Sequence, residues 1–327
     1  MKHLKIHGAE FDLESPTLVV ITGPTASGKS ALAIDVARQL GTEIISADSR
    51  QIYTGIPVVT AMPSQEELSQ VRHHLIDMLP LDAYYSASQF EQDALKIINE
   101  LFEKYGVAVV CGGSMLYIDA LCNGIDDLPT VPDNIRNLLK EVHQRNGDEW
   151  LLDRLKAMDP VYYDMVDKKN IKRVFHAIEI MAVSGWKYSN MITGEKKKRD
   201  FNILKLCVKM PREQLFDRIN RRVDAMVDAG LEEEARRVYP LRHLNSLNTV
   251  GLKEMFAYFD GMMDRDTAIA RIKKNTRVYA KKQMTWWKKD QDIIPLSLSG
   301  EPSLKPFCPG RLPPYVSGCR CVPSSSS

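Results

Sequence analysis

The sequence lacks a long apolar run, and its opposite charges nearly cancel. No stretch approaches the ~20 apolar residues of a membrane-spanning helix, and residues 1–8 (MKHLKIHG) lack the apolar core of a signal peptide. The 327 residues include 44 Lys and Arg against 42 Asp and Glu, so any affinity for a polyanion must come from local clusters. With 44% hydrophobic residues, the composition excludes collagen-like and wholly disordered chains. We expect a soluble, cytoplasmic protein with no membrane partner.

Cysteine is also sparse, and its spacing predicts neither a disulfide framework nor a good metal site. Cys111, Cys122 and Cys207 stand singly in apolar surroundings, as buried thiols of a reducing compartment do. The other three are Cys308, Cys319 and Cys321. Their spacing, with no histidine nearby, is poor for zinc, so we expect no zinc site there.

The first part of the chain alternates short β-branched runs with helical patterns. Strands are expected at 17–22, 43–46 and 107–111, and helices at 30–40 and 88–104. Crossovers of this length join parallel strands. The predicted fold class is therefore α/β, with a parallel sheet flanked by helices on both faces.

No convincing strand is found in residues 126–193. The helices expected there are 133–146, 149–158, 162–167 and 170–184. A strand at 201–208 resumes the earlier style, followed by helices at 212–229, 231–239, 252–260 and 266–289. This pattern predicts a discontinuous core of residues 1–125 and 200–290, a helical insertion of residues 126–199, and a poorly ordered, Pro- and Ser-rich tail of residues 291–327.

Residues 23–30 (GPTASGKS) match the phosphate-binding pattern G-x-x-x-x-G-K-[ST] between an expected strand and an expected helix. In such a P-loop, backbone N–H groups and the positive end of the helix face phosphate oxygens. The residues expected to bind a diphosphate are Gly23, Thr25, Ala26, Ser27, Gly28, Lys29 and Ser30. The hydroxyl of Ser30 is the expected ligand of a Mg²⁺ cofactor.

The P-loop does not reveal which group is transferred. Motor and switch ATPases usually have an apolar strand that ends in a Mg²⁺-binding Asp. Here the strand at 107–111 is followed by Gly-Gly-Ser, which disfavours those classes and leaves small-molecule kinases and diphosphate-using transferases.

An acidic residue does follow the second strand, at Asp48. At the carboxyl edge of the sheet its carboxylate could accept a proton from an attacking nucleophile. Asp48 and Gln51 also fit a helix capping box, and spacing alone does not separate the two interpretations.

Several segments together resemble the tRNA dimethylallyltransferases (tRNA isopentenyltransferases). They are residues 23–30, 45–53 (ISADSRQIY), 112–117 (GGSMLY), 173–179 (RVFHAIE), 218–223 (RINRRV), 230–232 (GLE) and 280–286 (AKKQMTW). Their order and spacing extend the resemblance over residues 15–290.

This resemblance implies transfer of a dimethylallyl group from dimethylallyl diphosphate to the N6 amine of an adenosine adjacent to the anticodon of tRNA. It also implies a P-loop core, with an insertion that grips the anticodon stem-loop. Asp48 would be the general base, Arg222 would face the diphosphate, and Ser114, in place of a more usual threonine, would keep a hydroxyl near the target nucleotide.

The same resemblance assigns contacts with tRNA. The residues are Asp48, Ser49, Arg50, Gln51, Ser114, Lys172, Arg173, His176, Lys253, Arg277, Lys281 and Lys282. The helix expected at 266–289 is strongly basic and includes Trp286 and Trp287, and residues 196–199 (KKKR) form a second basic cluster. Such clusters suit RNA phosphates, although each alone is more often a solvated face.

Three positions depart from the family pattern. Residues 55–63 (GIPVVTAMP) replace the usual G-x-D-I-G-T-A-K-P, His176 stands where arginine is common, and Leu252 replaces a usual tyrosine. These changes bear on tRNA affinity more than on the type of reaction.

Three other functions remain open from the sequence. An adenylate isopentenyltransferase would need neither the long insertion nor the basic helix, and a small-molecule kinase would place ATP in the P-loop. A non-catalytic RNA-binding protein would leave the P-loop unused. We expect a monomeric enzyme, although the sequence carries no direct signal for oligomeric state.

Overall fold

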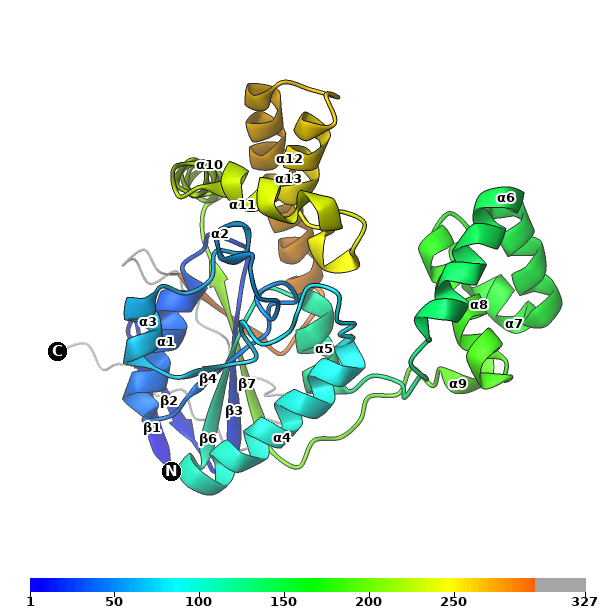
Figure 1. Cartoon of the computed structure of the whole chain (residues 1–327). Coiled ribbons are helices and arrows are strands. Elements are labelled where there is room, and N and C mark those ends of the chain that lie inside the picture. The colour runs from blue at the N-terminus through cyan, green and yellow to red at the C-terminus, as the bar shows by residue number, and fades with distance from the viewer. Residues whose placement is uncertain (298–327) are drawn as a thin grey trace. The chain divides into compact units, whose positions relative to one another are not determined.

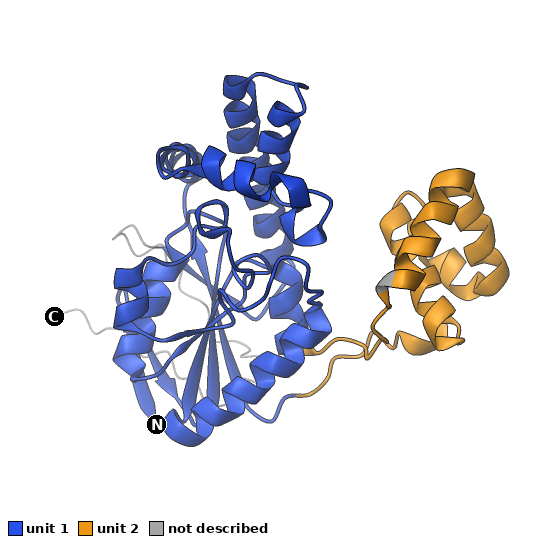
Figure 2. Ribbon diagram, in the orientation of Figure 1, with its two compact units in different colours: residues 1–122, 199–327 blue, residues 123–198 orange. Residues whose placement is uncertain are grey.

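The computed structural model describes residues 1–297 and divides into two compact units. Unit 1 contains residues 1–122 and the chain from residue 199 onward, and unit 2 contains residues 123–198 (Figure 2). The expected insertion was residues 126–199. The observed unit 2 therefore begins three residues earlier and ends one residue earlier than the expected insertion.

Unit 1 is built on a six-stranded sheet in which every pairing is parallel. Its order is β5 (His73–His74), β4 (Ile44–Ser46), β6 (Val107–Cys111), β3 (Thr17–Thr22), β7 (Asn202–Lys209) and β8 (Ile293–Ser297). Strands β3 and β6 are buried along their whole length, which explains their unbroken apolar character. The α/β fold class predicted from the sequence is confirmed.

Helices cover both faces of this sheet (Figure 1). Helices α1 (Lys29–Leu40) and α3 (Gln65–Gln70) lie on one face, and α4 (Ala87–Tyr105) and α5 (Met115–Asn123) lie on the other. Beyond the carboxyl ends of the strands lie α2 (Pro57–Thr60), α10 (Arg212–Asp228), α11 (Leu231–Val238), α12 (Leu252–Phe259) and α13 (Arg265–Trp287). These last helices stand over the sheet edge at which ligands of such folds bind.

Local sequence explains where the helices beside the sheet begin and end. The Ser86 hydroxyl accepts a hydrogen bond from the Gln89 nitrogen and caps α4, which ends at Gly106 with a φ of 71°. Helix α1 ends in the same way at Gly41, with a φ of 60°. The apolar face of α1 includes Val36, which is fully buried in the core cluster against the sheet.

The N-terminal residues form a hairpin that the sequence analysis did not predict. Strands β1 (Lys2–Ile6) and β2 (Ala9–Leu13) pair antiparallel in a separate sheet. Their buried residues alternate with exposed ones and join the core cluster beside α1. This period-two pattern was a readable signal for strands.

Residues 291–327 were expected to be a poorly ordered tail, and for residues 293–297 this prediction is wrong. Strand β8 pairs with β7 and buries Leu296 against the core. Lys205 Nζ lies 2.8 Å from Asp290 Oδ2, which fixes the chain just before the strand. Pro295 is tolerated because β8 is an edge strand. The rest of the predicted tail, with Cys308, Cys319 and Cys321, lies outside the described residues.

Unit 2 is a small helical body with its own apolar core. Its helices are α6 (Asp133–Met158), α7 (Pro160–Met165), α8 (Ile171–Ser184) and α9 (Tyr188–Met191). Gly147, with a φ of 79°, interrupts α6 where the sequence predicted two helices. The buried Asp159 accepts backbone hydrogen bonds from Tyr162 and Ser189, tying α7 to α9.

Among residues 1–297, no helix is both long enough and apolar enough to cross a lipid bilayer.

Candidate active site

The loop between β3 and α1 has the backbone of an anion cradle. Gly23, Ala26 and Gly28 have φ angles of 148°, 63° and 94°, so the chain curls tightly before α1 begins at Lys29. A Cβ atom on Gly23 would lie 3.0 Å from the carbonyl oxygen of Val208, so β7 also limits that position to glycine. No side chain caps the N-terminus of α1, which leaves its first N–H groups for an anion.

Two side chains of this loop support the same interpretation. Ser27 is fully buried, and its Oγ has no hydrogen-bond partner among the described residues. A buried hydroxyl without a partner is costly unless a ligand supplies one. Ser30 is exposed in the first turn of α1 and lines the adjoining cavities.

Asp48 lies in a turn that follows β4, and no helix begins there. Its Oδ1 accepts a hydrogen bond of 2.9 Å from the Arg50 nitrogen. Gln51 is used elsewhere: its side chain bonds to Ser46 Oγ and to the carbonyl oxygens of Thr60 and Ala61. The capping-box interpretation is therefore wrong, and the carboxylate closes a turn at the cavity wall.

Ser114, directly after the paired glycines, supports this turn from the neighbouring strand. Its Oγ accepts a hydrogen bond of 2.8 Å from the Ser49 nitrogen, and its own nitrogen donates to the Ala47 carbonyl oxygen at 3.2 Å. A Cβ atom on Gly112 would lie 2.1 Å from that same carbonyl oxygen. The glycine allows β6 to approach the backbone just before Asp48.

Lys29 and Arg222 bring positive charge to the same place. Burial lowers the pKa of Lys29 and that of Arg222, while the negative charge of Asp48 opposes the shift in both. Two half-buried cations and one carboxylate thus line the same cavity, and an incoming anion would stabilise the positive charges.

These groups line one cavity of about 530 Å³ in unit 1. Its walls include Lys29 and Ser30 of the P-loop helix, Asp48 and Ser114 of the sheet edge, and Arg222 of α10. A second cavity of about 770 Å³ is lined in part by the same residues, among them Lys29, Ser30, Arg222, Ala61 and Met226. Val58 and Met62 line the second cavity alone. Both cavities therefore have polar and apolar walls, and they adjoin at the shared residues.

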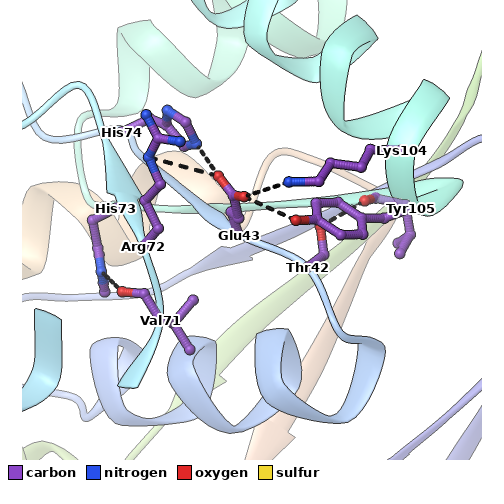
Figure 3. Close-up of polar contacts among 9 residues, drawn as sticks. Thr42, Glu43, Val71, Arg72, His73, His74, Lys104 and Tyr105 are labelled. Atoms are coloured by element: carbon purple, nitrogen blue, oxygen red, sulfur yellow. Dashed lines mark hydrogen bonds and ion pairs between the residues drawn. The ribbon is translucent and has the colours of Figure 1, made fainter. Parts of the chain in front are cut away.

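A charged cluster holds the edge strand beside the first cavity (Figure 3). Glu43 Oε2 lies 2.6 Å from His74 Nε2 of β5, and the Tyr105 hydroxyl donates to Glu43 Oε1 at 3.0 Å. His73, which lines the cavity, bonds through Nδ1 to the Val71 carbonyl oxygen. Burial alone would raise the pKa of Glu43, but the hydrogen bonds from His74 and Tyr105 leave it below its ordinary value.

The predicted tRNA contacts fall into separate groups. In unit 1, Lys253 and Lys282 are exposed and line the first cavity. Arg277 donates to Asn220 Oδ1 at 2.6 Å, and Lys281 lies over the Phe216 ring. In unit 2, Lys172 and Arg173 are exposed on α8, and His176 Nδ1 lies 3.5 Å from Glu179 Oε2. Their contact with tRNA stays a prediction.

Some predicted RNA-facing groups have partners within the protein. The Arg50 guanidinium donates to the carbonyl oxygens of Asn245, Ser246 and Asn248, so it organises that loop. Arg199 of the basic run is half-buried and bonds to Glu91 and to the carbonyl oxygens of Ala120 and Leu121. Trp287 is buried, whereas Trp286 is 39% exposed.

One residue of the site was missed entirely by sequence reasoning. Gln283 of α13 is 1% exposed and bonds to both the P-loop and the turn after β6. Gln283 lies within residues 280–286, a segment that carries the family resemblance, and that segment was the available signal for a role at the site.

A parallel sheet whose central strand passes through a glycine-rich anion cradle into a helix defines a P-loop α/β protein. Within that class the chain belongs to the IPP transferase family, whose profile matches residues 51–290. The prediction of this family from sequence motifs is confirmed, and the chain is a transferase.

Individual relatives agree with this assignment. Proteins named tRNA dimethylallyltransferase 2 from Azobacteroides pseudotrichonymphae and Parabacteroides distasonis are 49% and 50% identical to it over 277 residues. The match covers 85% of this chain and 90% and 93% of theirs.

Two solved structures are similar over 86% of this chain. One is the full-length tRNA isopentenylpyrophosphate transferase of Bacillus halodurans, which is 34% identical to this chain, with a TM-score of 0.63; the match covers 90% of that protein. The other is a eukaryotic dimethylallyltransferase described as acting on tRNA, with 25% identity, 74% coverage and a TM-score of 0.72.

Proposed function

We propose that this protein transfers a dimethylallyl group from dimethylallyl diphosphate to the N6 amine of an adenosine adjacent to the anticodon of tRNA. The observation that carries the proposal is one cavity lined by a cationic P-loop and by the Asp48 carboxylate. The relatives named for tRNA dimethylallyl transfer support the choice of substrates. The presence of tRNA in the cytoplasm makes that the expected site of action.

The chemistry needs both sides of this cavity. The exocyclic nitrogen attacks the allylic carbon, a C–N bond forms, and the C–O bond to the diphosphate breaks. Asp48 accepts the proton that the amine loses, while the P-loop amides, Lys29 and Arg222 stabilise the departing diphosphate. Stabilising the leaving group matters because a neutral exocyclic amine is a weak nucleophile.

The protein groups at the cradle also suit a Mg²⁺ ion. Magnesium prefers oxygen ligands and commonly binds through few protein atoms, with substrate phosphates and water filling its other positions. Ser30 offers an exposed hydroxyl at the start of α1, and no cluster of three or more His, Cys, Asp or Glu residues among residues 1–297 would compete for the ion. When bound, Mg²⁺ would neutralise charge on the diphosphate oxygens.

The substrate amine must leave the base stack to reach a side chain in this cavity, at a cost of a few kcal/mol that is smaller in a single-stranded loop than in a duplex. The exposed lysines at the cavity, Lys253 and Lys282, are suited to phosphate contacts beside such an extruded nucleotide. Unit 2 has exposed basic groups of its own at Lys172 and Arg173, which are suited to contacts with RNA phosphates.

Radiolabelled dimethylallyl diphosphate, supplied in parallel with unmodified tRNA or with AMP, tests the proposal. A third reaction contains labelled ATP and tRNA. Label in tRNA, mapped to the adenosine beside the anticodon, is the expected result. Label in AMP alone would indicate an adenylate isopentenyltransferase, and turnover of ATP alone would indicate a kinase; either result would overturn the proposal.

A further inference from the structure

Gln283 connects three segments that meet at the active site. Its Oε1 accepts a hydrogen bond of 2.9 Å from the Thr25 nitrogen of the P-loop, and its Nε2 donates to the Gly113 carbonyl oxygen at 2.9 Å. The two partners lie 258 and 170 positions away in the sequence. One planar amide on α13 thus uses its acceptor for one active-site loop and its donor for the other.

The packing leaves this amide little freedom. Gln283 is 1% exposed, and a Cβ atom on Gly113 would lie 2.4 Å from its Nε2. The Tyr279 hydroxyl, one turn earlier on α13, also donates to the Gly113 carbonyl oxygen at 3.3 Å. Loss of the amide would therefore leave the half-buried Thr25 N–H without its protein partner.

Through Gly113, Gln283 is connected to the turn next to Asp48, the proposed base. Ser114 follows directly, and its hydroxyl holds the Ser49 nitrogen next to Asp48. The Thr25 side leads to the cradle that would receive the leaving group. Gln283 therefore spans from the loop that faces the diphosphate to the turn that positions the carboxylate.

We infer that Gln283 is a positioning residue that holds the P-loop and the Gly113–Ser114 turn in register, so that Asp48 and the leaving group keep their productive separation. This inference rests on the proposed function for its catalytic consequence. Misplacement of reacting groups by about 1 Å can cost ~100-fold in rate. The effect should therefore fall on the chemical step rather than on tRNA binding.

Three variants test this role. Gln283→Leu removes both hydrogen bonds at similar volume. Gln283→Glu keeps the acceptor for Thr25 but, when ionised, offers Gly113 no donor; burial raises the pKa of the new carboxyl group, so acidification restores the donor. Thr285→Ala is the control, because the exposed Thr285 hydroxyl bonds only to the Lys281 carbonyl oxygen within α13.

For Gln283→Leu we expect kcat to fall roughly 10- to 100-fold, with the Kd for tRNA within about twofold of the wild-type value. For Gln283→Glu, the ratio of its kcat to that of the wild type should rise several-fold between about pH 8 and about pH 6. The control should behave as the wild type. Hydrogen exchange at the Thr25 amide should be faster in Gln283→Leu than in the wild type.

Wild-type kcat in both Gln283 variants would overturn the inference. So would unchanged Thr25 exchange, or a kcat ratio for Gln283→Glu that does not respond to pH. If Gln283→Leu does not fold, the pH response of Gln283→Glu still decides the question. A wild-type protein that transfers nothing to tRNA would defeat the proposed function instead, and Thr25 exchange would still test the connection itself.

Discussion

Ser114 Oγ and the Ser49 backbone nitrogen lie 2.8 Å apart, joining the end of β6 to the turn that carries Asp48. Ser114 is 8% exposed and Ser49 is half-buried, so this hydrogen bond is partly shielded from water. The Ser114 hydroxyl therefore directly supports the turn next to Asp48, the base in the proposed function, whatever contact it makes with a nucleotide.

Replacing Ser114 should separate this support from other roles. Ser114→Ala removes the acceptor of the half-buried Ser49 N–H, which should lower the free energy of unfolding by about 0.5–1.5 kcal/mol and also lower kcat. Ser114→Thr keeps the hydroxyl and should stay close to the wild type. Urea unfolding and single-turnover transfer measure the two effects, and an unimpaired alanine variant would contradict the account.

At a pH near or above its lowered pKa, Lys29 should take up a proton when the site binds pyrophosphate. Burial lowers the pKa of Lys29, and a bound anion favours its charged ammonium form. As the pH rises and Lys29 loses its proton, pyrophosphate binding should weaken, and it should do so at a lower pH than it would with an exposed lysine. Without ligand, Lys29 has a lower pKa in the folded state than in the unfolded state. Between these two pKa values the unfolded state binds more protons, so the free energy of unfolding should rise with pH in that window.

Calorimetric titration of pyrophosphate in two buffers of different ionisation enthalpy measures this uptake. Lys29→Met should remove the part of this uptake that belongs to Lys29, and it should weaken binding by about 1.5–3 kcal/mol because a hydrogen bond to a charged group is lost. Equal proton uptake in the wild type and in Lys29→Met would contradict this prediction.

Glu43 should contribute stability that disappears in acid. Hydrogen bonds from His74 and Tyr105 hold the pKa of Glu43 below its ordinary value, so its contribution is present above that ordinary value and is lost as the pH falls through the folded-state pKa. Glu43→Gln should be less stable than the wild type near neutral pH, and the two should converge in acid. A constant difference across the pH range would contradict this.

The paired glycines after β6 should tolerate substitution unequally. A methyl group on Gly112 would meet the Ala47 carbonyl oxygen, which is backbone, whereas on Gly113 it would meet the end of the Gln283 side chain. Gly112→Ala should therefore cost at least about 3 kcal/mol, and Gly113→Ala roughly 1–3 kcal/mol with a loss of kcat. Thermal unfolding and transfer assays compare them, and the reverse order of stability would argue against this packing.

The sequence was most informative where chemistry and local structure coincide. Residues 23–30 predict both a phosphate site and a strand–loop–helix unit. The fully buried strands β3 and β6 are continuous apolar runs in the sequence. The sequence identified Asp48 both as a candidate base and as a possible helix cap. Only the observed turn, in which Asp48 accepts a hydrogen bond from the Arg50 backbone nitrogen, excluded the helix cap.

What could not be predicted depended on distant partners or on mixed patterns. The hydrogen bonds of Gln283 join residues that no local periodicity relates. The Arg50 side chain bonds to a loop almost 200 positions away in the sequence, which no local pattern predicts. Strand β8 was hidden by Pro295 and by the composition that follows it. Its apolar alternation at Ile294 and Leu296 was the available signal.

Asp48→Asn tests the central claim most directly, since the amide oxygen can still accept the Arg50 hydrogen bond while the side chain can no longer act as a base. We predict that tRNA prenylation falls roughly 100- to 10,000-fold, with the Kd for pyrophosphate within about threefold of the wild-type value. Transfer at close to the wild-type rate would contradict the account and leave Asp48 with a purely structural part in its turn.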